Sequence, residues 1–105
     1  ISGVFDLDPI PHLPTNEDIQ LDPNMARRLS PHFLEPANDA PLTVIVGSSE
    51  LPEFIRQSKD FADKWSTHLS SIEYLELCGL NHFTIVDTMD RANDPITARM
   101  LAYMK

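Results

Sequence analysis

The sequence predicts an α/β fold in which parallel strands are flanked by helices. A short apolar run at 42–46 and an alternating run at 72–77 both have the composition of strands. An amphipathic helical pattern lies between them, and a further helical pattern closes the chain. Strands that alternate with helices of this length are typical of βαβ units, which build parallel sheets.

The first 41 residues carry most of the nine prolines. Each proline fixes φ and removes a backbone donor, so we interpret residues 1–41 as a long, lid-like excursion across a surface. One helix is expected within it, with Asp22 as N-cap, Pro23 at the first helical position and residues 25–29 following. The Ser-Pro pair at 30–31 should end that helix.

The strand-helix-strand unit follows. The run at 42–46, LTVIV, is mostly apolar and β-branched, as in a buried strand of a parallel sheet, and Gly47 ends it. Pro52 opens a helix, and the run at 72–77 is a strand with one wetter face. Six residues of that helical pattern share one face at helical spacing: Phe54, Ser58, Phe61, Ala62, Trp65 and Leu69.

After this unit we expect a turn at 78–81, a short helix at 83–89, and a last helix capped by Asp94 with Pro95 at its start. Four residues give that helix an apolar stripe: Ile96, Met100, Leu101 and Met104. Two strands alone make a poor sheet, so we expect something outside this chain to cover and extend them.

Composition limits the class of protein. The 105 residues are 42% hydrophobic and 23% charged, which suits one globular unit. A net charge of −8 argues against nucleic-acid binding, which needs clustered lysine and arginine. The single cysteine excludes an internal disulfide and favours a cytoplasmic location, and no apolar run is long enough to span a membrane. The chain opens without an initiator methionine, so we expect its true N-terminus to be missing.

Two polar side chains follow the two predicted strands. Glu50 comes just after the first strand and His82 just after the second. Ligands of open parallel sheets bind beyond the carboxyl ends of the strands, where these residues should approach each other. A carboxylate beside an imidazole fixes its tautomer and stabilises the imidazolium, as a general base requires. A surface pair is the alternative interpretation.

Three segments carry a resemblance to a known family. Residues 2–10 read SGVFDLDPI, residues 50–58 read ELPEFIRQS, and residues 81–86 read NHFTIV. In this order they resemble segments of the arylformamidases, or kynurenine formamidases, and of their esterase relatives. The Ser-Pro at 30–31 is similar to the pair that closes the lid-like excursion of that family.

The resemblance implies the C-terminal part of an α/β-hydrolase, with the lid-like excursion at 1–41 and the catalytic acid and histidine within 42–105. It implies that Glu50 is the triad acid and His82 the triad base. The family usually has Asp where this chain has Glu50, and Glu53 is a nearby competitor for the acid.

The nucleophile is expected outside this chain. A nucleophile elbow needs Gly-x-Ser-x-Gly, and no two of the three glycines are four positions apart. Cys78 is interpreted as a small buried residue rather than a thiol nucleophile.

Other polar residues are given surface roles. Arg27 and Arg28 are interpreted as a solvated helix end, with an anion site as the alternative. Three other histidines lack metal-ligand spacing: His12, His32 and His68.

Two functional hypotheses remain. The first is a serine hydrolase, most simply an arylformamidase that converts N-formylkynurenine to kynurenine and formate, with a general carboxylesterase as the alternative. It needs a small-molecule substrate and the N-terminal part of the hydrolase, and no metal or organic cofactor; a homodimer is possible. The second is a catalytically incomplete piece that acts only as an interaction module.

Overall fold

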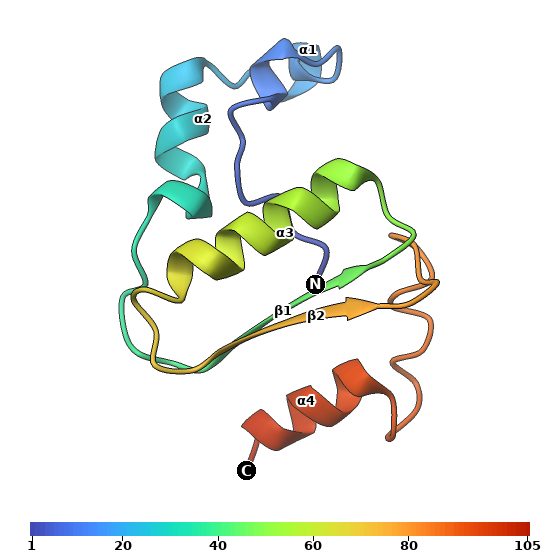
Figure 1. Cartoon of the computed structure of the whole chain (residues 1–105). Helices are drawn as coiled ribbons and strands as arrows, with labels where there is room; N and C mark the ends of the chain where they lie inside the picture. Colours follow the sequence, from blue (N-terminus) through green and yellow to red (C-terminus); the bar gives the residue numbers. More distant parts are fainter.

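A computed structural model describes all of the chain, Ile1–Lys105. It has a mixed α/β architecture, as predicted, with two parallel strands flanked by helices (Figure 1). The elements in chain order are the 3₁₀ turn η1 (Ile10–His12), α1 (Asn16–Ile19), α2 (Pro23–Leu29), the 3₁₀ turn η2 (Pro31–Phe33), β1 (Leu42–Gly47), α3 (Pro52–Trp65), β2 (Ile72–Leu77) and α4 (Pro95–Tyr103).

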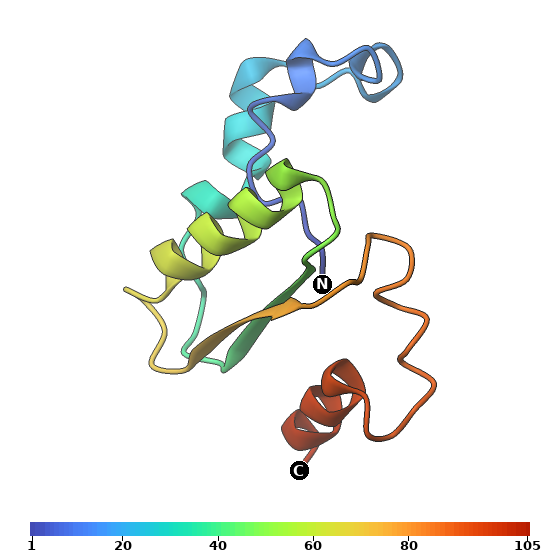
Figure 2. The same cartoon turned by 45° about the vertical axis from the view of Figure 1, so that its right-hand side comes forward.

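The two strands lie side by side in parallel, with Leu42 opposite Ile72 and Gly47 opposite Leu77. Successive side chains of a strand point to opposite faces. Val44 therefore packs against Phe61 of α3, whereas Ile45 packs in a second cluster with Ile96 of α4. The turned view shows α3 and α4 on opposite faces of the sheet (Figure 2).

Helix α3 forms the main packing contact with the sheet. The Phe61 ring stacks on Phe5, with ring centroids 4.1 Å apart, and lies beside Trp65 at 4.6 Å. The Trp65 indole also donates to the carbonyl of Pro31. The predicted apolar face of this helix is therefore a packing surface, and it ties the N-terminal excursion (residues 1–41) to the sheet.

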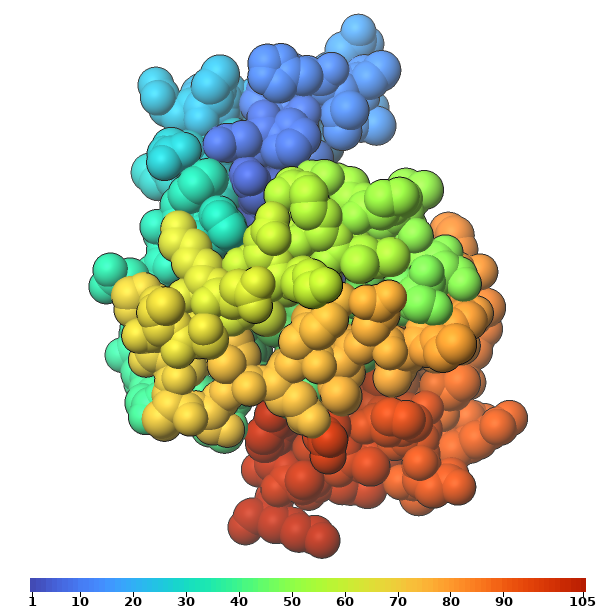
Figure 3. Space-filling model, viewed as in Figure 1, coloured from blue at the N-terminus to red at the C-terminus, as the bar shows by residue number.

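The N-terminal excursion contains the predicted helix. The Asp22 carboxylate accepts from the backbone N–H of Met25, and α2 ends at Leu29. Ser30 then fastens the segment, because its hydroxyl accepts from the N–H of Leu7 and donates to the carbonyl of Ala26. The space-filling view shows the blue part of the excursion, which includes α1 and α2, beyond α3 on the side away from α4 (Figure 3).

The prediction of a helix at 83–89 is wrong. That segment is a chain of turns, with bonds from Asp87 to Thr84 and from Met89 to Val86 that each span three residues. Asn81 caps the first turn, because its side-chain oxygen accepts from the N–H groups of Phe83 and Thr84 and its carbonyl accepts from the N–H of Ile85, but the four-residue bonds stop there. The β-branched run at 84–86 lowers helix propensity.

One burial prediction also fails, and the apolar stripe expected on α4 is covered only in part. Ile96 is buried, whereas Met100, Leu101 and Met104 are exposed. Helix α4 meets the sheet through Ile96 at its start, through an ion pair between Arg99 and Glu73, and through a hydrogen bond between the hydroxyls of Tyr103 and Thr43. Cys78 is exposed rather than buried, because the strand ends at Leu77 and the chain turns at Gly79, whose φ is +75°.

No helix combines the length and apolar character needed to cross a bilayer.

Candidate active site

Glu50 is held from three sides in the turn after β1. Its side chain is fully buried, with 0% exposed. One carboxylate oxygen, Oε1, accepts from the Ser2 hydroxyl at 2.5 Å and from the Gly47 N–H at 3.0 Å. The other oxygen, Oε2, lies 3.0 Å from Nδ1 of His82. Each oxygen of this carboxylate therefore has a defined partner.

Backbone contacts between the two strand-end loops bring these residues together. Ser48 donates to the carbonyl of Leu77, and Ser49 donates to the carbonyl of Leu80. The close contact between the loop after β1 and the backbone of Leu80 requires glycine at position 47, because a Cβ there would lie 2.1 Å from the Leu80 oxygen. The close backbone contact places the loop that carries His82 directly over the end of β1.

The loop that carries His82 is shaped by Asn81. The Asn81 side-chain oxygen accepts from the N–H groups of Phe83 and Thr84, both at 2.9 Å. The His82 ring packs against Phe54 of α3, with centroids 4.7 Å apart, and its side chain is 47% exposed. Its second nitrogen, Nε2, makes no hydrogen bond within the chain, so it is open to a group from outside.

Glu50 is ionised at neutral pH. Burial alone would raise the pKa of this carboxyl, but hydrogen bonds from Ser2, Gly47 and His82 outweigh burial and hold the pKa below its ordinary value. A negatively charged carboxylate next to Nδ1 favours the tautomer with its proton on Nδ1. Nε2 is then the acceptor that a general base needs.

The rival acid, Glu53, is engaged elsewhere. Its carboxylate is about half exposed and pairs with Arg56 at 2.6 Å, and it also accepts from Gln57. The hydrogen bond from Arg56 lowers the pKa of Glu53 to about 2. It makes no contact with His82, so the geometry selects Glu50 as the partner of the imidazole.

The remaining candidates lie away from this pair. Arg27 pairs with Asp8 at 3.7 Å and lies over the Phe33 ring, which is a surface packing role. No group of three or more His, Cys, Asp or Glu residues could hold a metal ion. The sequence lacks a nucleophile elbow, and the Ser2 hydroxyl bonds to Glu50 rather than to His82.

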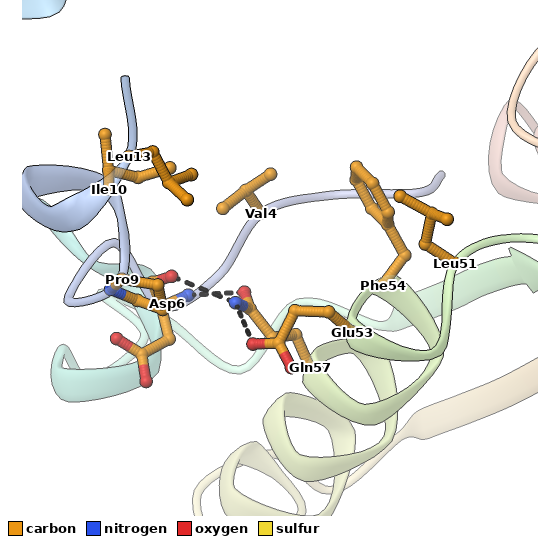
Figure 4. Close-up of a pocket in the computed structure, with 9 residues that line it drawn as sticks. All are labelled: Val4, Asp6, Pro9, Ile10, Leu13, Leu51, Glu53, Phe54 and Gln57. Atoms are coloured by element: carbon orange, nitrogen blue, oxygen red, sulfur yellow. Dashed lines mark hydrogen bonds between the residues drawn. The ribbon is translucent and has the colours of Figure 1, made fainter. Parts of the chain in front are cut away.

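A cavity of about 270 Å³ lies between the excursion and the start of α3 (Figure 4). The excursion contributes Val4, Ile10 and Leu13, and the start of α3 contributes Leu51 and Phe54. Gln57 fixes one wall, because its amide accepts from the N–H groups of Phe5 and Asp6 and donates to Glu53. Phe54 lines the cavity and also packs against the imidazole, so one side chain links the cavity to His82.

Two residues of the site escaped the sequence prediction. Phe54 was expected as part of a packing face and of a segment that resembles a family, and Ser2 as part of another such segment, but no site role was assigned to either residue. Ser2 and Glu50 are 48 residues apart, and no spacing rule links them.

The chain is similar to two curated proteins over nearly its whole length. It is 26% identical over 106 residues to "Kynurenine formamidase" of Danio rerio and 27% identical over 110 residues to "Kynurenine formamidase" of Salmo salar. The aligned regions cover 96% and 99% of this chain. The chain is a distant homologue of the kynurenine formamidases.

This homology to kynurenine formamidases supports the α/β-hydrolase family, and two parallel strands flanked by helices are consistent with part of that fold. The chain spans only 36% and 37% of the length of these two relatives. No protein-family model and no solved structure matches it.

Proposed function

We propose that this chain supplies the catalytic acid and base of a serine hydrolase whose nucleophilic serine lies in another part of the protein. The observation that carries the proposal is the 3.0 Å contact between His82 Nδ1 and the buried Glu50 carboxylate. The carboxylate is held by two further donors, and Nε2 is open. This is the arrangement that a histidine base requires.

In the proposed reaction, Nε2 of His82 takes the proton of the serine as the serine attacks an acyl carbonyl. His82 then gives this proton to the leaving nitrogen or oxygen, and the carbon–heteroatom bond breaks. In the second half, His82 takes a proton from water as the water attacks the acyl carbon. It then gives this proton to the serine oxygen as the bond between that oxygen and the acyl carbon breaks and the acid leaves. Glu50 stays ionised and stabilises the imidazolium in both halves.

The proposed substrate is N-formylkynurenine, which would yield kynurenine and formate. The names of the two relatives support this choice. The cavity that shares Phe54 with the His82 contact also supports it, because its surface is mainly apolar and suits an aromatic ring. Small carboxylic esters are the alternative substrates within the same reaction class.

Hydrolysis of N-formylkynurenine and of p-nitrophenyl acetate by the complete protein tests this proposal. We expect His82→Ala to lower kcat by at least about 1,000-fold while the fold stays intact, since the ring is half exposed. His68→Ala, at an exposed histidine beyond α3, is the matched control. Ester hydrolysis without formamide hydrolysis would favour the esterase alternative. Near-wild-type turnover by His82→Ala would contradict the catalytic role.

An interaction module is the second candidate. Three large apolar side chains near the C-terminus are exposed: Met100, Leu101 and Met104. The N-terminal part of the hydrolase, or a second copy of the chain, is the partner proposed for this surface. Robust hydrolysis of p-nitrophenyl acetate by the isolated 105 residues would exclude an inert module and would also show that the nucleophile lies within them.

A further inference from the structure

We propose that Ser2 is a positioning residue, whose hydroxyl fixes the orientation of the Glu50 carboxylate toward His82. The inference rests on the proposed function and deepens it. The Ser2 hydroxyl donates to Oε1 of Glu50 at 2.5 Å, and the Gly47 N–H donates to the same oxygen at 3.0 Å. With Oε1 held by two donors, Oε2 is the oxygen left for Nδ1 of His82.

The backbone places Ser2 independently of its hydroxyl. Its N–H donates to the carbonyl of Ile45 at 2.8 Å, so the residue is attached to β1 itself, and the N-terminus lies beside this strand (Figure 1). Ser2 is only 9% exposed. The donor is therefore fixed by the same strand that ends at the turn carrying Glu50.

The backbone of Ser2 is also strained. Its φ is +48°, in the left-handed region that residues other than glycine seldom occupy. Glycine would take this conformation without strain, but it would supply no hydroxyl. Strain of this kind persists where the surroundings determine the conformation, and it is concentrated at functional sites. The serine thus combines an unfavourable backbone with a contact that glycine could not make.

Loss of the hydroxyl has a defined consequence. Oε1 would keep only the Gly47 N–H, and a buried carboxylate with fewer donors is less stable in its ionised form. The carboxyl group would also gain rotational freedom about its terminal bond. Both effects weaken the interaction between the Glu50 carboxylate and Nδ1 of His82 when the imidazolium forms.

Ser2→Ala and Ser2→Gly in the complete protein test the proposal. Both variants remove the hydroxyl, but only glycine relieves the strain. We expect kcat to fall roughly 10-fold in both, with KM changed less than about twofold. The thermal midpoint of the glycine variant should exceed that of the alanine variant. Ser66→Ala, at an exposed serine at the end of α3, is the control and should match the wild type.

A second readout does not depend on turnover. The pKa of Glu50, followed by ¹³C NMR of its carboxyl carbon, should rise in both variants because a donor to the ionised form is lost. An unchanged pKa, or a kcat that follows stability so that only the alanine variant is impaired, would overturn the proposal. A raised pKa in a protein without any His82-dependent hydrolysis would instead refute the proposed function and leave the contact between Ser2 and Glu50 intact.

Discussion

The Nδ1 atom of His82 and the Oε2 atom of Glu50 lie 3.0 Å apart, although 32 residues separate them in the chain. Their approach follows from the topology. Each residue comes shortly after one of two parallel strands in register, so both loops leave the sheet at the same edge. The site therefore depends on the strand ends as much as on the two side chains.

Gly47→Ala should separate the two loops. The new Cβ would lie 2.1 Å from the Leu80 oxygen, a backbone atom that can move only with its loop. We expect a loss of about 1–3 kcal/mol in the free energy of unfolding, together with a large fall in kcat. Urea unfolding and turnover measure the two effects. Gly79→Ala is the control, because its Cβ would meet nothing within 4 Å although φ is +75°. It should reduce stability while largely sparing kcat.

Glu50→Asp should weaken the pair without removing the charge. The side chain is shorter by one methylene, about 1.5 Å. The carboxylate then cannot reach His82 while keeping its bonds to Ser2 and Gly47. We expect kcat to fall about 10- to 100-fold, and Glu50→Gln to cost more, up to roughly 10,000-fold, because the charge is lost. Steady-state kinetics of both variants measure these changes in kcat. Equal activity of Glu50→Asp and the wild type would show that the reach of Glu50 is unimportant.

Acid should destabilise the protein partly through Glu50. Its pKa in the folded state lies below the ordinary value of 4.5, so ionised Glu50 stabilises the fold above that pH. This contribution is lost as the pH falls through the lowered pKa. Chemical unfolding from about pH 7 to about pH 3 should therefore show a shallower decline in stability for Glu50→Gln than for the wild type. Glu17→Gln, at an exposed glutamate, is the control, and its decline should parallel that of the wild type.

The apolar cavity should affect binding more than chemistry. Leu13 lines it from the excursion, whereas Phe54 lines it from α3 and also packs on the imidazole ring. Leu13→Ala should raise KM for N-formylkynurenine several-fold with kcat unchanged, because it removes binding energy shared by ground and transition states. Phe54→Ala should change both constants. A Leu13→Ala variant with unchanged KM would place the substrate elsewhere.

The strand-helix-strand unit could be predicted from sequence because each of its elements has a strong local pattern. Residues 42–47 and 72–77 pair as expected, and α3 starts at Pro52. Both aspartate caps, at Asp22 and Asp94, also bond as predicted. The approach of Glu50 to His82 followed from parallel topology, whereas their catalytic roles stay a prediction.

The remaining features depend on contacts that no local pattern encodes. The segment at 83–89 does not continue as a helix, although the Asn81 side chain caps its first turn. Ser2 reaches Glu50 because its backbone N–H bonds to Ile45 of β1, a residue far from it in the sequence. The exposed apolar residues of α4 show that an apolar stripe predicts one face of a helix but does not identify what packs against that face.

Labelling with a fluorophosphonate, which reacts with activated serines, tests most directly the claim that His82 is a base for a serine outside this chain. The complete protein should be labelled at one serine outside these 105 residues. His82→Ala should slow this labelling by at least about 100-fold, because the serine loses its base. Labelling at the wild-type rate in His82→Ala, or a label on a serine within residues 1–105, would contradict the account.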